Sequence, residues 1–342
     1  MAGPEQTAVG VTVQARIRAI DRGCLFGITY LGSAIWHLLC EAKRADILHA
    51  HHLYLDAMAA LIAGWIRRRP VVAKMVGAGP GGDLDRLRQT VGGSLFLRLL
   101  RALDAVIAPS PTCRAELIQA GFAADRIHII ANGVDLAEFH PDGRLESTPP
   151  FSPHGRPMVV FTGRLIEAKG LLELLEAWSL VLREIPDAHL CLVGSGPLEA
   201  ELRRRAALSP LAARVDLVGE VADVRPYLRA ASAFVFPSWA EGLPNALLEA
   251  MAMCLPCVAS DIGPIRDAMR DGEEGFLVPV KAPNKLVVAL ITILSRPELA
   301  ARLGHAARKR VEAEFSLGRE VDYLEALYRE LCLQRGREGR RG

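Results

Sequence analysis

The sequence predicts an α/β protein built from two parallel sheets, each covered by helices on both faces. Short apolar runs rich in β-branched residues alternate with amphipathic stretches along most of the 342 residues. A passage rich in Pro, Gly and Ser over residues 141–157 interrupts the alternation once, after which it restarts. The length also suits roughly two domains. Because strict alternation is typical of parallel sheets, we expect ligands to bind between the two units, at the carboxyl ends of strands.

In the first unit, apolar and polar residues alternate over 11–20, which predicts a strand with one face in water. A helix is expected to follow over 26–43. Brief apolar runs predict strands over 71–76, 104–108 and 126–130, and helical spacing predicts a helix over 112–120. We place this first domain at residues 1–145.

The second unit repeats the alternation with clearer boundaries. Strands are predicted over 158–162, 189–193, 215–218, 233–237 and 257–260. Helices are predicted between and after them, over 170–183, 197–207, 224–230, 244–253 and 264–270. We place this second domain at residues 146–315, and expect a C-terminal helix over 316–333 to pack back towards the first domain.

The composition excludes several classes of protein. Apolar residues make up 51% of the chain and charged residues 23%, which excludes global disorder. The 41 Lys and Arg against 39 Asp and Glu leave a net charge of +2, which argues against a nucleic-acid-binding protein that works by bulk charge. The 7 Cys at irregular spacing do not suggest a disulfide framework, so a reducing cytoplasm is favoured.

The sequence also predicts that the protein does not span a membrane. Its most apolar stretch, over 58–66, is shorter than the ~20 residues that a membrane-spanning helix needs, and three arginines close it. The first residues have neither the basic region nor the apolar core of a secretory signal. We therefore expect a cytoplasmic protein, either soluble or peripherally associated with the inner face of the membrane.

Three glycine-containing loops follow predicted strands. Gly163-Arg164-Leu165 and then Lys169-Gly170 place two permanent cations beside a backbone that a ligand can approach, although alone they would equally suit a solvated loop. The loops over 194–197 and 77–83 each resemble part of a dinucleotide-binding turn. The first lacks the third glycine, and no acidic residue follows the second at the spacing that ribose binding requires. Both interpretations are rejected.

The segment over 237–252 carries the strongest chemical signal. A predicted strand ends at Pro237, a loop carries Glu241, and Pro244 begins a helix whose free N–H groups suit a diphosphate. Glu249 stands further along this helix, among Leu, Ala and Met residues. A buried carboxylate is costly without a partner, so Glu249 is expected to accept hydrogen bonds from sugar hydroxyls.

These motifs, in this order, resemble glycosyltransferase family 4, also called glycosyl transferases group 1. Further segments over 46–51, 108–110, 130–135 and 274–278 match the habit of the family, and the resemblance covers residues 46–330. It implies the GT-B fold, in which two Rossmann-like domains face each other across a cleft. It also implies a retaining transferase that uses a nucleotide-sugar donor.

The resemblance assigns roles by position. Arg164 and Lys169 would hold the donor diphosphate, Glu241 would touch the donor sugar near its reacting carbon, and Glu249 would bind the ribose hydroxyls. The other donor-binding positions would be Gly163, Gly194, Gly196, Glu220, Val221, Gly242, Leu243, Pro244 and Asn245. The acceptor side would hold His51, Gly79 and Asn132. Two cations and a helix N-terminus can neutralise a diphosphate, so neither a metal nor another cofactor is expected. The implied mechanism is front-face transfer, in which a donor phosphate oxygen takes the proton of the acceptor.

Two alternative sites were weighed. His49 and His51 would point to the same side of a strand, but no Cys or acidic residue at ligand spacing accompanies them, so a metal site is not favoured. Cys254 and Cys257 resemble a redox pair, yet they follow a helix and lack the dipole that lowers a thiol pKa, so packing is the favoured role.

The first domain departs from the family in two respects. Many relatives carry a cleft histidine where this chain has Val76, while Lys74 fits a lysine- and glycine-rich variant of the family. Only 45 residues precede the motif at Asp46, and none of them suggests the usual first strand, Gly-rich loop and helix. We therefore expect these elements to be missing, with the run over 11–20 filling the gap in the sheet.

The expected function is hexosyl transfer from a nucleotide-sugar to a sugar, lipid-linked or small-molecule acceptor, in the synthesis of a polysaccharide, glycolipid or small glycoside. Two alternatives remain open: a catalytically impaired partner subunit with the same fold, and a non-transferase such as a nucleotide-sugar epimerase. The presence of Arg164, Lys169, Glu241 and Glu249 favours the transferase.

Overall fold

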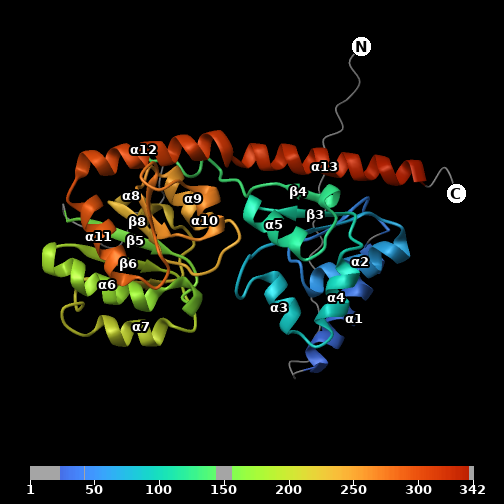
Figure 1. The fold of residues 1–342 in the computed structure, drawn as a ribbon, viewed down its shortest axis with the longest axis horizontal. Helices are drawn as coiled ribbons and strands as arrows, with labels where there is room; N and C mark the ends of the chain where they lie inside the picture. The colour runs from blue at the N-terminus through green and yellow to red at the C-terminus, as the bar shows by residue number, and fades with distance from the viewer. Residues whose placement is uncertain (1–23, 42, 144–155, 339–342) are drawn as a thin grey trace, which may run out of the picture.

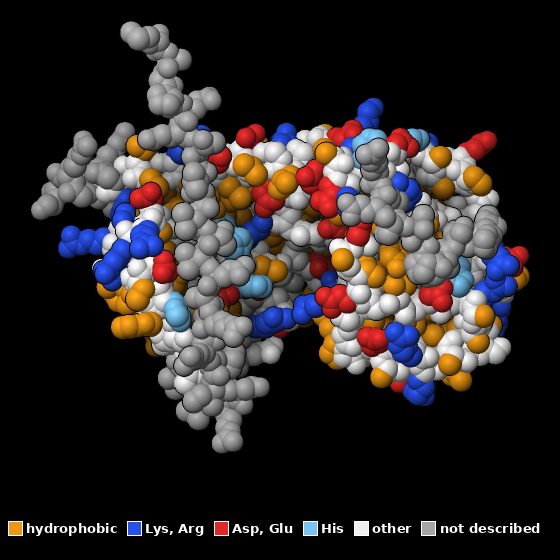
Figure 2. Space-filling model, turned by 180° about the vertical axis from the view of Figure 1, so that it is seen from behind, with side chains coloured by type: hydrophobic (Ala, Val, Ile, Leu, Met, Phe, Trp, Pro, Cys, Tyr) orange, Lys and Arg blue, Asp and Glu red, His pale blue; other side chains and the backbone are white. Residues whose placement is uncertain are grey.

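A computed structural model describes residues 24–41, 43–143 and 156–338. It consists of two α/β domains that lie side by side, with a long C-terminal helix running along the edge of the first (Figure 1). Viewed from behind, the surface is hollowed where the two domains meet (Figure 2). The strand expected over 11–20, and the predicted loss of the first strand and loop, concern residues outside the described ranges.

The first domain contains a parallel sheet of 4 strands in the order β1-β2-β3-β4. Its elements are α1 (Cys24–Glu41), β1 (Leu48–Ala50), α2 (Leu55–Arg67), β2 (Val71–Lys74), α3 (Asp83–Gln89), α4 (Gly93–Leu100), β3 (Ala105–Ala108), α5 (Pro111–Gln119), a short 3₁₀ helix (Ala124–Arg126) and β4 (Ile127–Ile129). The predicted strands and helices of this region are confirmed to within a few residues. Helices α2, α3 and α4 were not predicted; α3 is mostly charged, and Gly92 lies between it and α4.

Strand periodicity decides what each face of this sheet contacts. Val71 and Ala73 face the core that the sheet shares with α2 and α4, whereas Val72 between them faces the opposite side. There it packs with Leu327 and Leu331 of α13 (Leu317–Glu338). The last helix of the chain therefore completes the core of the first domain.

The second domain contains a parallel sheet of 6 strands in the order β10-β9-β8-β5-β6-β7. Its elements are β5 (Met158–Thr162), a short 3₁₀ helix (Glu167–Lys169), α6 (Leu171–Glu184), β6 (His189–Val193), α7 (Glu199–Ala206), β7 (Val215–Gly219), α8 (Arg225–Ala230), β8 (Ala233–Phe236), α9 (Asn245–Ala252), β9 (Cys257–Ser260), α10 (Gly263–Ala268), β10 (Gly275–Val278), α11 (Pro283–Leu294) and α12 (Pro297–Glu314). All five predicted strands and all five predicted helices of this region are present.

The order of these strands creates a switch point between β5 and β8. From β5 the chain adds β6 and β7 on one side, and it then returns to add β8, β9 and β10 on the other. The loops that follow β5 and β8 therefore diverge and leave a crevice at the carboxyl edge of the sheet. In α/β sheets this is where ligands bind.

The chain crosses between the domains twice, and the two crossings lie together. Val134 and Ser316 form a β-bridge, and the Val134 N–H donates to the Phe315 carbonyl at 2.8 Å. Glu320 of α13 reinforces this junction, since its carboxylate accepts the Gly133 N–H at 2.7 Å and pairs with Lys74 of β2 at 2.8 Å.

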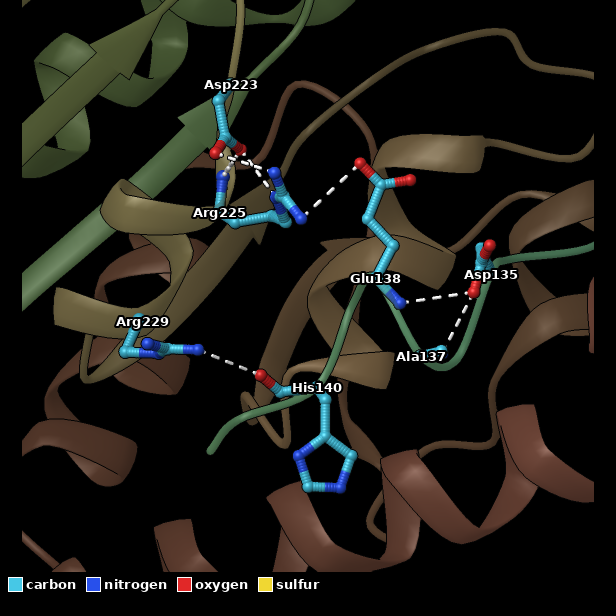
Figure 3. A network of polar contacts seen from close by, with 7 residues as sticks. All are labelled: Asp135, Ala137, Glu138, His140, Asp223, Arg225 and Arg229. Carbon is cyan, nitrogen blue, oxygen red and sulfur yellow. Dashed lines mark hydrogen bonds and ion pairs between the residues drawn. The ribbon is translucent and has the colours of Figure 1, made fainter. Parts of the chain in front are cut away.

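The segment that follows the first crossing already belongs structurally to the second domain (Figure 3). Asp135 caps the turn by accepting the N–H groups of Ala137 and Glu138. Arg225 pairs with Asp223 at 2.8 Å and with Glu138 at 3.5 Å. The Arg229 side chain donates to the His140 carbonyl at 3.1 Å. These contacts hold residues 135–140 against α8, so the two crossings between the domains lie at Val134 and Ser316.

Candidate active site

Lys169 and Glu241 form the centre of the site. Lys169 stands after β5 and Glu241 after β8, and their side chains pair across the switch point at 2.5 Å. Both are largely buried, with 16% and 12% of the side chain exposed, and the Lys169 ammonium also lies 4.9 Å from the centre of the Phe236 ring. Arg164, in the same loop as Lys169, is exposed, and its side chain makes no hydrogen bond or ion pair within the described ranges. The Lys169 ammonium is thus fixed, and the Arg164 guanidinium remains available to an anion.

The glycines after β5 and β6 serve packing between two loops. A Cβ on Gly194 would lie 1.9 Å from the Gly163 carbonyl oxygen, and one on Gly196 would lie 2.5 Å from that of Leu165. The Leu165 N–H donates to the Ser195 carbonyl at 2.8 Å, which holds the loops together. The family resemblance assigned Gly194 and Gly196 to donor binding; in the structure both make room for the backbone of the loop that carries Arg164.

Helix α9 presents its N-terminus beside this pair. Pro244 precedes the helix, and its carbonyl accepts the N–H groups of Leu247 and Leu248 at 3.1 and 3.2 Å. The N–H groups of Asn245 and Ala246 make no hydrogen bond with any residue that the structure describes, so they remain free for an anion.

Asn132 links this helix start to the first domain. Its Nδ2 donates to the Leu243 carbonyl at 2.9 Å and to Asn245 Oδ1 at 2.6 Å. Its own Oδ1 is buried without a partner. Asn132 therefore contacts the predicted donor-binding loop in this arrangement of the domains.

Glu249 is a half-buried carboxylate without a hydrogen-bond or ion-pair partner among the described residues. Burial is the largest cause that raises its pKa above the ordinary value, and the negative charge of Glu138 raises the pKa further. Such a group is unfavourable in the free protein unless a ligand supplies hydrogen-bond donors.

The loop after β7 closes the other side of the crevice. Glu220 is exposed, and its carboxylate accepts a hydrogen bond from the Ser195 hydroxyl at 3.0 Å. Val221 beside it is half-buried. Gly194 and Gly219 form a β-bridge, in which the Gly194 N–H donates to the Gly219 carbonyl at 2.8 Å. This contact joins the ends of β6 and β7 and sets the position of the loop after β7.

The loop after β2 touches the site directly, a contact that the sequence did not reveal. The Ala78 N–H donates to the Glu241 carbonyl at 3.0 Å. A Cβ on Gly242 would lie 1.8 Å from the Val76 carbonyl oxygen. Glycine at position 242 is therefore required for this close approach of the two domains. The sequence showed a Gly-rich loop over 77–82 and a single glycine at 242, and neither indicated that the two loops meet.

A cavity of about 600 Å³ lies between the domains next to this contact. Gly79, Arg88 and Glu116 line it from the first domain, and Trp239 and Glu241 line it from the second. The Glu116 carboxylate accepts the Gly79 N–H at 2.9 Å, and burial raises its pKa above the usual value. The cavity therefore offers both hydrogen-bonding groups and an aromatic ring beside Glu241.

His51 does not share this cavity with Gly79, although both were assigned to the acceptor side. It lines a separate space of about 350 Å³ between β1, α1 and α2, with Tyr30 and His37. Its ring stacks on His49 at 4.5 Å between centroids, and His49 Nδ1 contacts the Tyr328 hydroxyl at 2.5 Å. Burial lowers the pKa of His49 to about 4, and the charges of His51 and Lys74 act in the same direction.

The structure also describes the other groups that were weighed. No set of three His, Cys, Asp or Glu side chains within the described ranges is placed to hold a metal ion. Cys257 is fully buried, its thiol contacts the Leu255 carbonyl, and burial raises its pKa, whereas Cys254 is only half-buried. Lys74 pairs with Glu320 and is thereby held at the junction of the domains. No helix of the described chain has the length and apolarity needed to cross a bilayer.

Two family models match the chain in succession. The model described as Glycosyltransferase Family 4 matches residues 2–138, and the model described as Glycosyl transferases group 1 matches residues 156–296. Together they cover both domains.

Individual glycosyltransferases are similar in sequence to this chain over most of their length. The alpha-maltose-1-phosphate synthase of Mycobacterium tuberculosis is 32% identical over 319 residues, which cover 85% of this chain and 80% of that protein. The D-inositol 3-phosphate glycosyltransferase 1 of Catenulispora acidiphila is 29% identical over 91% of this chain and 78% of its own length.

Solved structures share the architecture. HepE of Anabaena, solved with UDP and glucose, superposes with a TM-score of 0.74 at 22% identity, over 86% of this chain and 80% of that one. The sucrose-phosphate synthase of Thermosynechococcus elongatus superposes with a TM-score of 0.72 at 25% identity, over 91% of this chain and 80% of that one.

Proposed function

The chain belongs to glycosyltransferase family 4, and from that membership we propose that it transfers a hexosyl group from a nucleotide-sugar to an acceptor hydroxyl with retention of anomeric configuration. It is a glycosyltransferase with the GT-B fold. One observation carries the proposal: Arg164, Lys169 and Glu241 stand on the two loops that flank the switch point between β5 and β8.

Donor binding is supported by the charges at this point. The exposed guanidinium of Arg164, the ammonium of Lys169 and the free N–H groups at the start of α9 provide three sources of positive potential for a diphosphate. Glu249, which has no partner in the described chain, would accept hydrogen bonds from ribose hydroxyls. The nucleotide would thus lie over the carboxyl edge of the second sheet, with the loop of Glu220 and Val221 against its base.

The bond to the leaving group breaks as the diphosphate takes up negative charge. Lys169, held by Glu241, the available guanidinium of Arg164 and the α9 N-terminus can stabilise that charge, so we propose that no metal and no other cofactor is needed. Retention then follows if the acceptor oxygen attacks from the face that the diphosphate leaves. A donor phosphate oxygen would take the proton of the acceptor.

The acceptor would enter through the cavity of about 600 Å³ between the domains, because Glu241 lines it from the donor side. Polar groups beside Trp239 suit the hydroxyls and apolar faces of a sugar. We propose a sugar, lipid-linked or small-molecule acceptor, used in the synthesis of a polysaccharide, glycolipid or small glycoside. This work would take place in the cytoplasm, with peripheral association at the inner face of the membrane.

The test is donor binding followed by turnover. Saturation-transfer NMR against UDP-, GDP- and ADP-sugars identifies the donor, and the chosen donor is then assayed for transfer to a panel of acceptors. Glu249→Ala should weaken donor binding and Lys169→Ala should lower turnover, while Lys285→Ala on exposed α11 serves as the matched control. Donor binding that none of these variants alters would reject the site.

A second candidate is a catalytically impaired subunit on the same fold. It is favoured by one observation: position 76, where many relatives carry a cleft histidine, is Val, and the loop after it covers Gly242. This candidate predicts donor binding without donor hydrolysis or transfer. A nucleotide-sugar epimerase would instead consume the donor without any acceptor and release an isomerised sugar.

A further inference from the structure

Helices α1 and α2 end side by side at the outer end of the first domain, away from the donor site. The Arg67 Nε donates to the Leu39 carbonyl at 3.0 Å, which joins the last turns of the two helices. The chain beyond them stays together as well, since Arg69 lies 3.6 Å from Asp46. Residues from 43–46 and from 65–69 therefore share one end of the molecule.

This end is strongly basic. Lys43, Arg44, Arg67, Arg68 and Arg69 meet there, and the acidic side chains beside them are Glu41 and Asp46. We call these five cations the basic end. Figure 2 shows Lys and Arg side chains gathered at the left of the view, on the first domain.

Local structure explains only part of this charge. Arg67 caps a carbonyl and Arg69 has an ion pair, as expected near helix C-termini. Lys43, Arg44 and Arg68 are exposed, and their side chains make no hydrogen bond or ion pair with the rest of the described chain. Three unpaired cations in one place repel each other, so their grouping indicates an anionic partner.

Two large apolar side chains accompany the cations. Trp65 is 49% exposed and Ile66 is 59% exposed, at the end of a helix whose other apolar residues are mostly buried. An indole and an aliphatic chain next to Lys and Arg form the composition that enters a membrane interface, where the apolar parts reach the acyl boundary and the cations meet headgroups.

The exposure of these side chains favours a flat partner over an extended ligand held in a cavity. The five cations, Trp65 and Ile66 line none of the cavities of about 600, 360 and 350 Å³, although Glu41 beside them lines the last. The net charge of the whole chain is only +2, which leaves no extended basic track for a nucleic acid.

We propose that the basic end, with Trp65 and Ile66, docks the protein on an anionic lipid bilayer. The cations bind phosphate headgroups, and Trp65 and Ile66 enter the interface. The inference rests on the peripheral membrane association of the proposed function and names the surface responsible for it. Its residues lie outside the candidate donor site and its test requires no turnover, so it can fail while transfer persists.

The experiment measures sedimentation of the full chain with vesicles of phosphatidylcholine, with and without phosphatidylglycerol. We expect binding only to the anionic vesicles, falling as salt rises. A cation near an anionic leaflet contributes about fivefold to binding, so the double variant Arg44→Gln/Arg68→Gln should bind roughly 25-fold more weakly. Its matched control is Arg302→Gln/Lys309→Gln, which removes two exposed cations from α12 of the second domain and should bind like the unaltered chain.

A second readout locates the contact. Brominated lipids should quench tryptophan fluorescence, and Trp65→Phe should abolish the quenching while Trp36→Phe retains it. Equal binding to both vesicle types, or full binding by the double variant, would overturn the proposal. Quenching that only Trp36→Phe removes would assign the contact to the outer face of α1 and would also overturn it. Equally tight binding of single-stranded RNA, without a change in Trp65 emission, would assign the basic end to nucleic acid instead.

Discussion

The Lys169 ammonium and the Glu241 carboxylate join the loops after β5 and β8 at a distance of 2.5 Å. Each residue thereby fixes the other in a crevice that two diverging loops would otherwise leave loosely defined. Glu241 holds Lys169 where a diphosphate would lie, before any donor arrives. The ion pair is thus a positioning device for a cation that must also serve an incoming anion.

Lys169→Ala should lower kcat at least about tenfold, because one charge-assisted contact to the developing phosphate charge contributes about 1.5–3 kcal/mol. Steady-state kinetics with the identified donor measures this. Lys169→Arg retains the charge and should recover part of the loss. If Lys169→Ala has the same kcat as the Lys285→Ala control, the role assigned to Lys169 is wrong.

Gly242→Ala should separate donor binding from transfer. The added Cβ would lie 1.8 Å from the Val76 carbonyl oxygen, so the loop of the first domain must move away. A displacement of about 1 Å near the reacting centre can cost about 100-fold in rate, and we expect a fall of that order in kcat/KM with donor affinity preserved. Gly318→Ala, where a Cβ meets open space, is the matched control. Unchanged transfer by Gly242→Ala would show that the contact with Val76 is dispensable.

Glu249→Gln should stabilise the free protein and weaken donor binding. Because burial raises the pKa of Glu249, its neutral form favours folding below the ordinary carboxyl pKa, and this contribution is lost as pH rises through the raised value. Gln stays neutral throughout. The difference in Tm between Glu249→Gln and the unaltered chain should therefore grow from acidic to neutral pH, while calorimetry should show roughly tenfold weaker donor binding. A constant difference in Tm would contradict this.

Because of His49, the free energy of unfolding should fall as the pH is lowered. Its pKa in the folded chain is about 4, so the unfolded chain takes up the proton first as pH falls below the ordinary value of 6.5. About 3 kcal/mol of stability should be lost between pH 6.5 and 4. Urea unfolding across this range measures the loss, which His49→Gln should reduce and the control His305→Gln, an exposed histidine on α12, should not. Parallel pH profiles for all three proteins would refute the assignment.

Transfer should survive a chelator, because two cations and a helix N-terminus already face the diphosphate. Activity assayed in EDTA, with and without added Mn²⁺, tests this directly. Complete loss that Mn²⁺ restores would require a metal in the reaction.

The second domain was the more predictable half. Its strands are fully buried runs bounded by Gly or Pro, such as β5 and β9, and periodicity identifies such runs directly. The candidate donor loops were predicted with the rule that ligands bind at the carboxyl ends of strands, and Arg164 and Glu241 lie in the loops after β5 and β8.

The contacts that were not predicted from the sequence join residues that lie far apart in the chain. Lys74 and Glu320 are separated by 246 positions, and no local sequence pattern predicts that their side chains form an ion pair. The contact of Gly242 with Val76 depends on how two folded domains dock. The family resemblance placed both His51 and Gly79 on the acceptor side, but α1 and α2 enclose the first and the loop after β2 carries the second.

The position of α13 has a consequence for the folding of the protein during its synthesis. Leu327 and Leu331 complete the core over Val72 and Ile107, so one face of the first sheet lacks its cover until α13 has been translated. The second domain, whose elements run from β5 to α12, emerges complete before that. Although the first domain is translated before the second, the second should reach its native state earlier. The first domain therefore keeps apolar strand residues exposed until α13 has been made and can pack against them.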